Sequence, residues 1–262
     1  MNVLITGAAS GIGQATKEYY LNNNHNVIAL DIKEIKGQEN LKSFIVDITN
    51  EESLNNVNDY LINNNIKLDV IINIAGIHKM ASLVENNFND IKKLIDINLI
   101  GTMLVNNVFH KSLKEKGKII IITSEVATFD PLPFNGLYNI SKNALESYAQ
   151  ALRQELNLLN QKVITIRPGA IETDLSNNSM KDTEYLASNT KLYKKQAKNF
   201  LNIAKKFMGK PIKPIKIAKL IYKVSNKKHP KLSYSLHKNL GLVLLNILPK
   251  KLQCAIIKLI LK

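Results

Sequence analysis

The stretch Thr6-Gly7-Ala8-Ala9-Ser10-Gly11-Ile12-Gly13 decides the fold of this 262-residue chain. It follows the apolar run Val3-Leu4-Ile5, which is typical of a buried strand, and it leads into an amphipathic segment of helical period. Glycines at these positions let a strand turn sharply into a helix, and they leave room for a phosphate group at the helix N-terminus. A glycine turn also occurs in plain loops. Its place between a strand and a helix predicts a dinucleotide-binding turn here.

Strands and helices alternate along the chain after this turn. We expect strands at Asn2-Thr6, Asn26-Leu30, Lys42-Val46, Asp69-Asn73, Lys118-Thr123 and Lys162-Arg167, with a last strand from residues 229–234. Between them, Gly13-Leu21, Glu51-Asn63, Phe88-Leu113 and Leu137-Asn157 have helical period. This order predicts an α/β fold, with a single doubly wound Rossmann-type parallel sheet covered by helices on both faces.

The chain is long enough for one large domain, so we expect residues 1–262 to form a single Rossmann-type domain. Its nucleotide-binding and catalytic core would be residues 1–173. Residues 174–214, which are mostly polar and helix-prone, would form a substrate lid, and residues 215–262 a basic, helical C-terminal extension.

A second motif, Tyr138-Asn139-Ile140-Ser141-Lys142, places a phenol and an ammonium one helical turn apart. An alcohol that loses a hydride must also lose a proton, and a ketone that accepts a hydride must gain one. We expect the Lys142 ammonium to lower the pKa of Tyr138 from its ordinary value of about 10, so that the phenol can exchange this proton. The same spacing recurs at Tyr234 and Lys238, but no serine follows a preceding strand there, and we interpret that copy as a coincidence.

Asp31 ends the second expected strand. A carboxylate at this position can accept hydrogen bonds from the adenosine ribose and would repel a 2′-phosphate. The sequence therefore favours NAD(H), with NADP(H) still possible because Lys33 lies close by.

Together these motifs resemble those of the short-chain dehydrogenase/reductase family, over residues 6–173. Further matches are Asp47 in Val46-Asp47-Ile48, the run Asn73-Ile74-Ala75-Gly76, Asn98, Ser124 and the loop Pro168-Gly169-Ala170-Ile171-Glu172-Thr173. Ile74 departs from the asparagine that the family usually has there.

The resemblance implies a set of site residues. Asn98, Ser124, Tyr138 and Lys142 would be catalytic: Ser124 positions the substrate oxygen, and Asn98 holds a water that links Lys142 to solvent. The expected cofactor contacts are Thr6, Gly7, Ser10, Gly11, Ile12, Gly13, Asp31, Asp47, Ile48, Asn73, Ala75, Gly76, Tyr138, Lys142, Pro168, Gly169, Ile171 and Thr173. The resemblance also implies a homodimer or homotetramer.

Charge is distributed unevenly along the chain, whose net charge is +15. Residues 191–262 contain 19 lysines and no acidic residue, while residues 1–190 contain all 21 acidic residues. In the last stretch, Leu252, Ala255, Ile256, Leu259 and Ile260 recur at helical spacing. Such a helix can lie on an anionic membrane surface, or it can cover the substrate pocket or a subunit interface. Nucleic acid is a poor partner, since no recognition motif is present and arginine is scarce.

Composition bounds the remaining expectations. The single Cys254 allows no intrachain disulfide, and the five histidines lack the spacing of metal ligands. A strand-like run follows Met1 directly, so we do not expect a secretory signal. We expect a cytoplasmic enzyme, with peripheral contact at the inner membrane surface as an alternative.

The tail is similar to those of family members that act on retinoids, steroids and sphingoid lipids. We therefore expect an NAD(P)-dependent oxidoreductase that interconverts an alcohol and a ketone or aldehyde on a lipophilic substrate. The alternatives are NADPH-dependent reduction of a 3-oxoacyl thioester or small carbonyl, and a non-enzymatic redox sensor or scaffold that binds the nucleotide.

Overall fold

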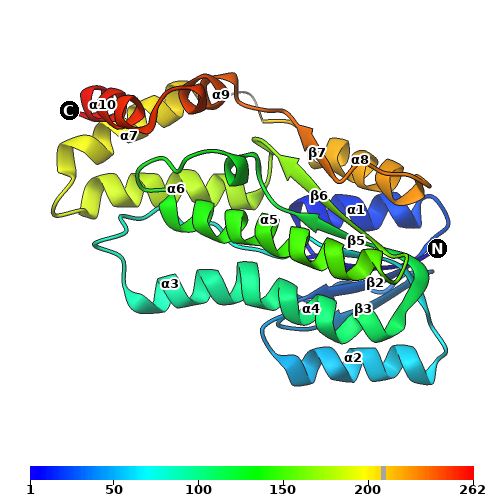
Figure 1. Ribbon diagram of the computed structural model, residues 1–262. Coiled ribbons are helices and arrows are strands. Elements are labelled where there is room, and N and C mark those ends of the chain that lie inside the picture. Colours follow the sequence, from blue (N-terminus) through cyan, green and yellow to red (C-terminus); the bar gives the residue numbers. More distant parts are fainter. Residues whose placement is uncertain (208–210) are drawn as a thin grey trace.

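A seven-stranded parallel sheet forms the centre of the protein, as the computed structural model shows (Figure 1). The structure describes residues 1–207 and 211–262. The strand order is β3-β2-β1-β4-β5-β6-β7, so the chain reverses its direction of winding between β1 and β4. The strands are β1 (Asn2–Thr6), β2 (Asn26–Asp31), β3 (Leu41–Ile45), β4 (Leu68–Asn73), β5 (Leu113–Ile122), β6 (Lys162–Pro168) and β7 (Ser233–Leu236).

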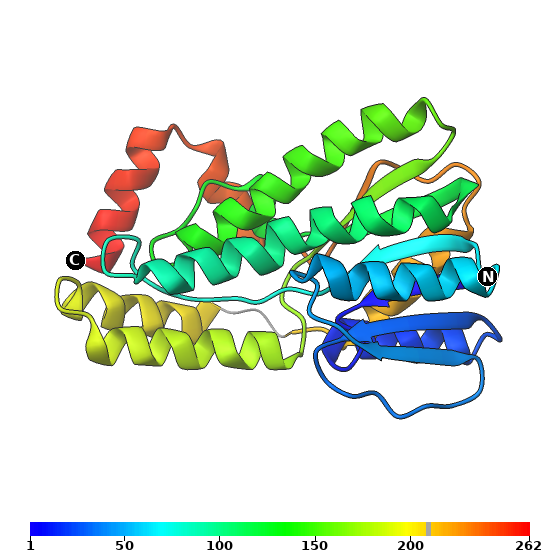
Figure 2. The same ribbon diagram turned by 90° about the horizontal axis from the view of Figure 1, so that it is seen from below.

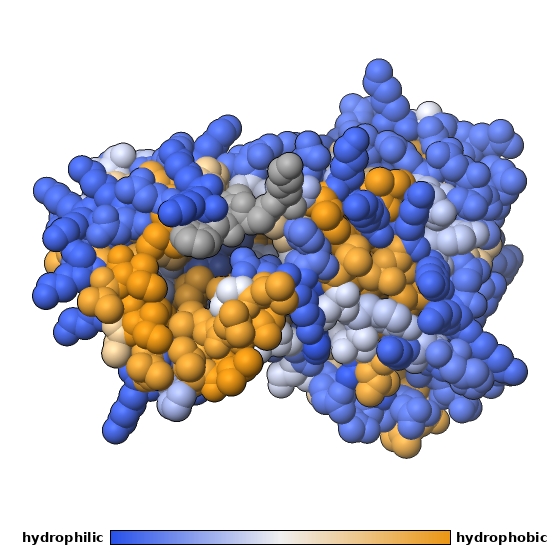
Figure 3. Space-filling view, turned by 90° about the horizontal axis from the view of Figure 1, so that it is seen from above, coloured by the Kyte–Doolittle hydropathy of each residue, from blue (hydrophilic) through white to orange (hydrophobic). Residues whose placement is uncertain are grey.

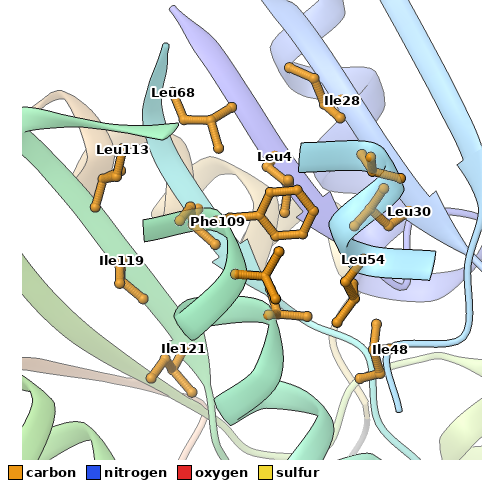
Figure 4. Packing of buried hydrophobic residues seen from close by; sticks show 14 of the residues in the cluster. Leu4, Ile28, Leu30, Ile48, Leu54, Leu68, Phe109, Leu113, Ile119 and Ile121 are labelled. Atoms are coloured by element: carbon orange, nitrogen blue, oxygen red, sulfur yellow. The ribbon is translucent and has the colours of Figure 1, made fainter. Parts of the chain in front are cut away.

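Helices cover both faces of this sheet, which confirms the expected Rossmann-type α/β fold. One layer contains α2 (Glu51–Asn63), α4 (Thr102–Phe109) and α5 (Gly136–Asn157). The other contains α1 (Gly11–Leu21) and α8 (Pro214–Asn226). Alternate residues of each central strand enter opposite cores, so Leu4 packs with the first layer and Val3 and Ile5 with the second. Figure 4 shows Phe109 of α4 in the first core, among Leu4, Leu30 and Leu54.

The segment expected as one helix over residues 88–113 has several parts. It contains α3 (Phe88–Ile95), a π-helical turn (Asp96–Gly101), α4 and a 3-10 turn (His110–Ser112). Gly101 lies against Ile48, where a Cβ would approach the isoleucine side chain to 2.7 Å. Strand β5 begins at Leu113, five residues before the expected start at Lys118.

Two helices occupy the region expected as a lid, α6 (Asp174–Asn189) and α7 (Lys194–Phe207). They run side by side at the end of the molecule farthest from the N-terminus (Figure 2). Residues 208–210 of the expected lid lie outside the described residues. A small cluster joins this pair to the body, because Phe134 packs with Leu186 and Ala197.

The segment expected as a helical extension, residues 215–262, has two parts with different places in the fold. Helix α8 contributes Ile217, Ile221 and Val224 to the core, and β7 pairs with β6 at the sheet edge. Pro230 cannot donate to a strand ladder, and β7 begins three residues after it. Only α9 (Leu240–Ile247) and α10 (Lys250–Leu261) therefore extend beyond the sheet and its layers.

Candidate active site

The glycine turn between β1 and α1 is too crowded for side chains. Gly7 has φ +68°, and a Cβ there would lie 2.9 Å from the Cα of Ala75. Gly11 has φ +52°, and a Cβ on Gly13 would lie 1.9 Å from the carbonyl oxygen of Gly7. The turn thus places backbone without side chains, and the N-terminus of α1, at the carboxyl ends of the strands. This arrangement fits the pyrophosphate of a dinucleotide.

A carboxylate lies at the end of the neighbouring strand β2. Asp31 accepts hydrogen bonds from the backbone N–H of Ala9 at 2.9 Å and of Lys33 at 3.0 Å. These two contacts fix the carboxylate beside the glycine turn. Asp47 is held in a similar way, because its Oδ1 accepts from the N–H of Thr49 at 2.9 Å and from its hydroxyl at 2.7 Å.

One cavity of about 460 Å³ connects these groups with the expected catalytic residues. Most of the residues expected in the site line it: Gly7, Ser10, Gly11, Ile12, Asp31, Asp47, Ile48, Ala75, Gly76, Ser124, Tyr138, Lys142, Pro168, Gly169, Ile171 and Thr173. The other four, Thr6, Gly13, Asn73 and Asn98, lie behind this lining. The cavity follows the carboxyl ends of the strands around the point where the winding reverses, which is where ligands bind in open α/β sheets.

The residues behind the lining hold its backbone in place. The Thr6 hydroxyl accepts from the backbone N–H of Ile74 at 3.0 Å and of Ala75 at 3.1 Å, and so joins the ends of β1 and β4. Asn73 donates to Asn106 at 2.7 Å. Thr6 and Asn73 therefore shape the site from beneath.

Helix α5 carries both members of the Tyr-x-x-x-Lys motif into the cavity. The Tyr138 hydroxyl hydrogen-bonds Ser124, and Lys142 donates to the carbonyl oxygen of Ile122 at 3.2 Å. Lys142 Nζ lies 5.8 Å from the centroid of the Tyr138 ring. Both side chains are buried, so the phenol, the serine hydroxyl and the ammonium face one small volume.

Burial, rather than the ammonium, sets the pKa of the phenol. It raises the pKa of Tyr138 to about 12, and the hydrogen bond from Ser124 only partly opposes it. Burial also lowers the pKa of Lys142 to about 8. The expectation that Lys142 lowers the pKa of Tyr138 below its ordinary value is thus wrong for this geometry, since burial disfavours the charged phenolate.

Asn98, which the resemblance assigns to holding a water, lies behind the cavity wall. It is fully buried in the π-helical turn, and its amide accepts from the N–H of Ile77 at 2.8 Å and donates to the carbonyl of Ile77 at 2.9 Å and to Ser141 at 3.1 Å. A Cβ on Gly76 would lie 3.1 Å from its Oδ1 and 3.6 Å from Lys142 Nζ. Asn98 therefore ties the loop after β4 to α5, directly behind the lysine.

His78 belongs to none of the sequence motifs, yet the structure places it beside Tyr138. Its ring packs against Tyr138 with centroids 4.3 Å apart, and its Nε2 lies 3.0 Å from Asn135 Oδ1. Burial lowers the pKa of His78 to about 4, so the imidazole beside Tyr138 is neutral. A position just after Gly76 is the only signal in the sequence, and it does not reveal that the ring folds back onto α5.

The second Tyr-x-x-x-Lys copy is not on a helix. Tyr234 lies in β7, and its hydroxyl accepts from the N–H of Lys231 at 2.9 Å. Lys238 lies beyond the end of β7 at Leu236. In an extended chain, residues at i and i+4 are roughly 13 Å apart, whereas on a helix they are neighbours.

Comparisons with known proteins agree with this geometry. The family model for short chain dehydrogenases matches residues 1–184. A 3-ketodihydrosphingosine reductase of Bacteroides thetaiotaomicron is 26% identical over 230 residues, which cover 87% of this chain and 84% of that protein. An NADPH-dependent 1-acyldihydroxyacetone phosphate reductase of Schizosaccharomyces pombe is 30% identical over 186 residues, 68% of this chain and 62% of that protein.

Solved structures are similar over most of the chain. A short chain dehydrogenase family protein from Francisella tularensis subsp. tularensis is 28% identical, with a TM-score of 0.74, over 90% of this chain and 96% of that one. A 4-hydroxyisoleucine dehydrogenase complexed with NADH and succinate is 26% identical, with a TM-score of 0.70, over 89% of this chain and 97% of that one.

Proposed function

The chain belongs to the short-chain dehydrogenase family, and we propose that it reduces the carbonyl group of a lipophilic ketone or aldehyde with NADH. As a member of this family it is an oxidoreductase. The observation that carries the proposal is the placement of Tyr138 and Lys142 in a cavity that continues to the glycine turn and Asp31.

Each side chain near Tyr138 has a proposed role in the proton transfer. Bound NADH would supply the hydride to the carbonyl carbon. Tyr138 would donate its hydroxyl proton to the carbonyl oxygen, while Ser124 hydrogen-bonds that oxygen and orients it. The Lys142 ammonium would stabilise the phenolate that Tyr138 leaves. A pKa of about 12 keeps the phenol protonated at neutral pH, which is the form that donates a proton to a carbonyl oxygen.

In our proposal, Asn98 takes no part in the proton transfer itself and holds the structure around Lys142. Its amide is already hydrogen-bonded to Ile77 and Ser141, and it would keep the floor of the cavity closed around Lys142.

The preference for NADH rests on Asp31. Two backbone N–H groups fix its carboxylate beside the glycine turn, where it would accept from ribose hydroxyls and repel a 2′-phosphate. Fluorescence titration with NADH and NADPH tests this preference. Asp31→Ser should weaken NADH binding and strengthen NADPH binding. Tighter binding of NADPH by the unchanged protein would contradict the assignment.

A lipophilic substrate is proposed on two grounds. The first is the names of the relatives above, which are reductases of an oxo-sphingoid base and of an acyl dihydroxyacetone phosphate. The second is the apolar side chains of Ile77, in the loop after β4, and of Leu175, in α6, which line the cavity. Under this proposal α6 and α7 form a lid over the substrate.

A panel of carbonyl compounds tests the whole proposal. We would measure NADH and NADPH oxidation with long-chain ketones, polycyclic ketones, aldehydes and 3-oxoacyl thioesters. Tyr138→Phe should reduce kcat by about 10²- to 10⁴-fold. Tyr234→Phe is the matched control, since it removes the hydroxyl of the second Tyr-x-x-x-Lys copy, and it should change little. Turnover that survives Tyr138→Phe would refute the mechanism, and turnover confined to thioesters with NADPH would refute the substrate class.

Assembly as a homodimer or homotetramer stays a prediction. Ile100, Met103 and Ile140 leave apolar area exposed on the π-helical turn, α4 and α5. Sedimentation of the purified protein at several concentrations measures the state directly.

A further inference from the structure

The apolar side of helix α10 faces solvent. Its residues Leu252, Leu259 and Ile260 are exposed, with Leu259 exposed by 77%, while Gln253 and Leu261 are buried. An amphipathic helix of a soluble domain usually turns its apolar stripe to the core. Here the stripe, which could cover a membrane surface, the substrate pocket or a subunit interface, faces outward.

Helix α9 has the same property. Among its residues, all of which are described, none is buried. Leu240, Leu244 and Ile247 follow one another at i, i+4 and i+7, and they are exposed by 75%, 66% and 74%. We call these three residues, together with Leu252, Leu259 and Ile260, the tail patch. Figure 3 shows hydrophobic side chains gathered around a hollow at the end of the molecule that carries α9 and α10.

Polar contacts fix the tail patch in this orientation. Asp130 lies beneath both helices: its N–H donates to Asn246 at 2.6 Å, and its Oδ2 accepts from Gln253 at 3.1 Å. Asn199 of α7 donates to the carbonyl of Leu261 at 3.2 Å. Asp130 follows the 3-10 turn (Glu125–Thr128) that comes directly after Ser124, so the patch is attached to the segment leading out of the active site.

Positive charge borders the patch. Residues 191–262 contain 19 lysines and no acidic residue. Lys251, Lys258 and Lys262 lie on one side of α10, next to the apolar stripe, and no ion pair with them occurs in the described part of the chain. Two copies joined through this surface would bring these ammonium groups together, which disfavours a second copy as the occupant.

We propose that the tail patch docks on an anionic membrane surface. The exposed leucines and isoleucines would enter the boundary between headgroups and acyl chains, and the bordering lysines would contact anionic headgroups. No helix within residues 1–207 and 211–262 is long and apolar enough to cross a bilayer, so the contact is peripheral. Docking would bring the segment that follows Ser124, to which Asp130 belongs, toward the membrane. It does not depend on the reaction, because the patch is separate from the residues that line the cavity.

Vesicle sedimentation with the full chain, without substrate or cofactor, tests the proposal. We expect binding to vesicles of phosphatidylcholine with phosphatidylserine, and little binding to phosphatidylcholine alone. The double variant Leu244→Gln, Leu259→Gln should lower the partition coefficient by at least about tenfold, since two exposed side chains lose their burial in lipid. Lys251→Gln with Lys258→Gln should also lower it, and added salt should weaken binding of the unchanged protein.

Matched controls lie near the amino ends of β5 and β6, whereas the tail helices follow the carboxyl end of β7. Leu158→Gln removes an exposed leucine after α5, and Lys116→Gln removes an exposed lysine of β5, and neither should change the partition. Failure to bind anionic vesicles, or equal binding to both vesicle types, would overturn the proposal. So would unchanged vesicle binding by the leucine variant, or a change in its oligomeric state without a change in vesicle binding. Because no turnover is measured, failure here leaves the proposed reduction untouched.

Discussion

Replacement of Gly13 by alanine should damage the fold and the proposed cofactor site together. An alanine Cβ at this position would lie 1.9 Å from the carbonyl oxygen of Gly7 and 2.6 Å from its carbonyl carbon. Reaching an ordinary contact of 3.4 Å requires a movement of about 1.5 Å (3.4 minus 1.9). The atoms in conflict are backbone, so no side-chain rotation relieves the clash.

Helix α1 cannot make this movement freely. Its Tyr20 is fully buried, and the Tyr20 hydroxyl donates to Ser225 of α8 at 2.6 Å. Overpacking of this kind costs about 1–3 kcal/mol, and we expect the upper end because backbone must move. About 3 kcal/mol corresponds to a fall in Tm of roughly 6–12 °C for a domain of this size.

The second expected effect is on nucleotide binding. A displaced N-terminus of α1 no longer directs its N–H groups at the pyrophosphate, so the Kd for NADH should rise by at least about tenfold, or 1.4 kcal/mol. Thermal unfolding and NADH fluorescence titration measure the two effects separately. Gly37→Ala is the matched control, because nothing lies within 4 Å of a Cβ at Gly37.

The outcomes separate the packing argument from the site assignment. An unchanged Tm for Gly13→Ala, relative to Gly37→Ala, would refute the packing argument. A lower Tm with an unchanged Kd for NADH would show that the turn is structural and does not bind the pyrophosphate.

Two further predictions concern ionised groups. Glu146 on α5 accepts from Arg167 Nε at 2.8 Å and Nη2 at 2.6 Å, and these contacts outweigh partial burial and lower its pKa. Glu146→Gln should therefore cost about 2–3 kcal/mol at pH 7, measured by urea unfolding, whereas the exposed Glu155→Gln should cost little. The stabilisation by Glu146 is present above the unfolded pKa of about 4.5, and it is lost as pH falls through the lower pKa of the folded protein. If the free energy of unfolding of Glu146→Gln changed with pH as that of the unchanged protein does, this account would be contradicted. Burial lowers the pKa of Lys142 to about 8, so kcat/KM for reduction should be flat near pH 6 and fall tenfold per unit above about pH 8, as the ammonium deprotonates. A profile that stays flat to pH 10 would show that the charge of Lys142 is not required.

Local patterns predicted the sheet well. Each central strand is a short apolar run that is buried on both faces, as Val3, Leu4 and Ile5 show, so the sequence itself indicates a strand. The motif residues on the cavity wall were also predictable, because the glycine turn, the strand-terminal acid and the i, i+4 pair can each be recognised from residues that are close together in sequence. The strand order places them at one edge of the sheet, and parallel α/β topology predicts that edge.

Sequence patterns predicted the elements less well where one segment of helical period contains several elements in different parts of the fold. The helix expected over residues 88–113 contains a π-helical turn at Asn98, and a helical period of apolar residues does not show such a turn. The segment 215–262 contains α8 and β7 as well as the two tail helices, since composition alone does not distinguish a lysine-rich helix of the core layer from one on the surface.

By itself, the sequence determined the fold class, the glycine turn and the Tyr138–Lys142 pair, because each depends on neighbours within a few residues. Only the tertiary structure decided the pKa of Tyr138, the packing of His78 against it and the outward orientation of α10. Each of these depends on groups distant in sequence: desolvation by the surrounding walls, a loop folded back onto α5, and Asp130 beneath the tail helices. Burial is a property of the assembled fold, and no local pattern of residues specifies it.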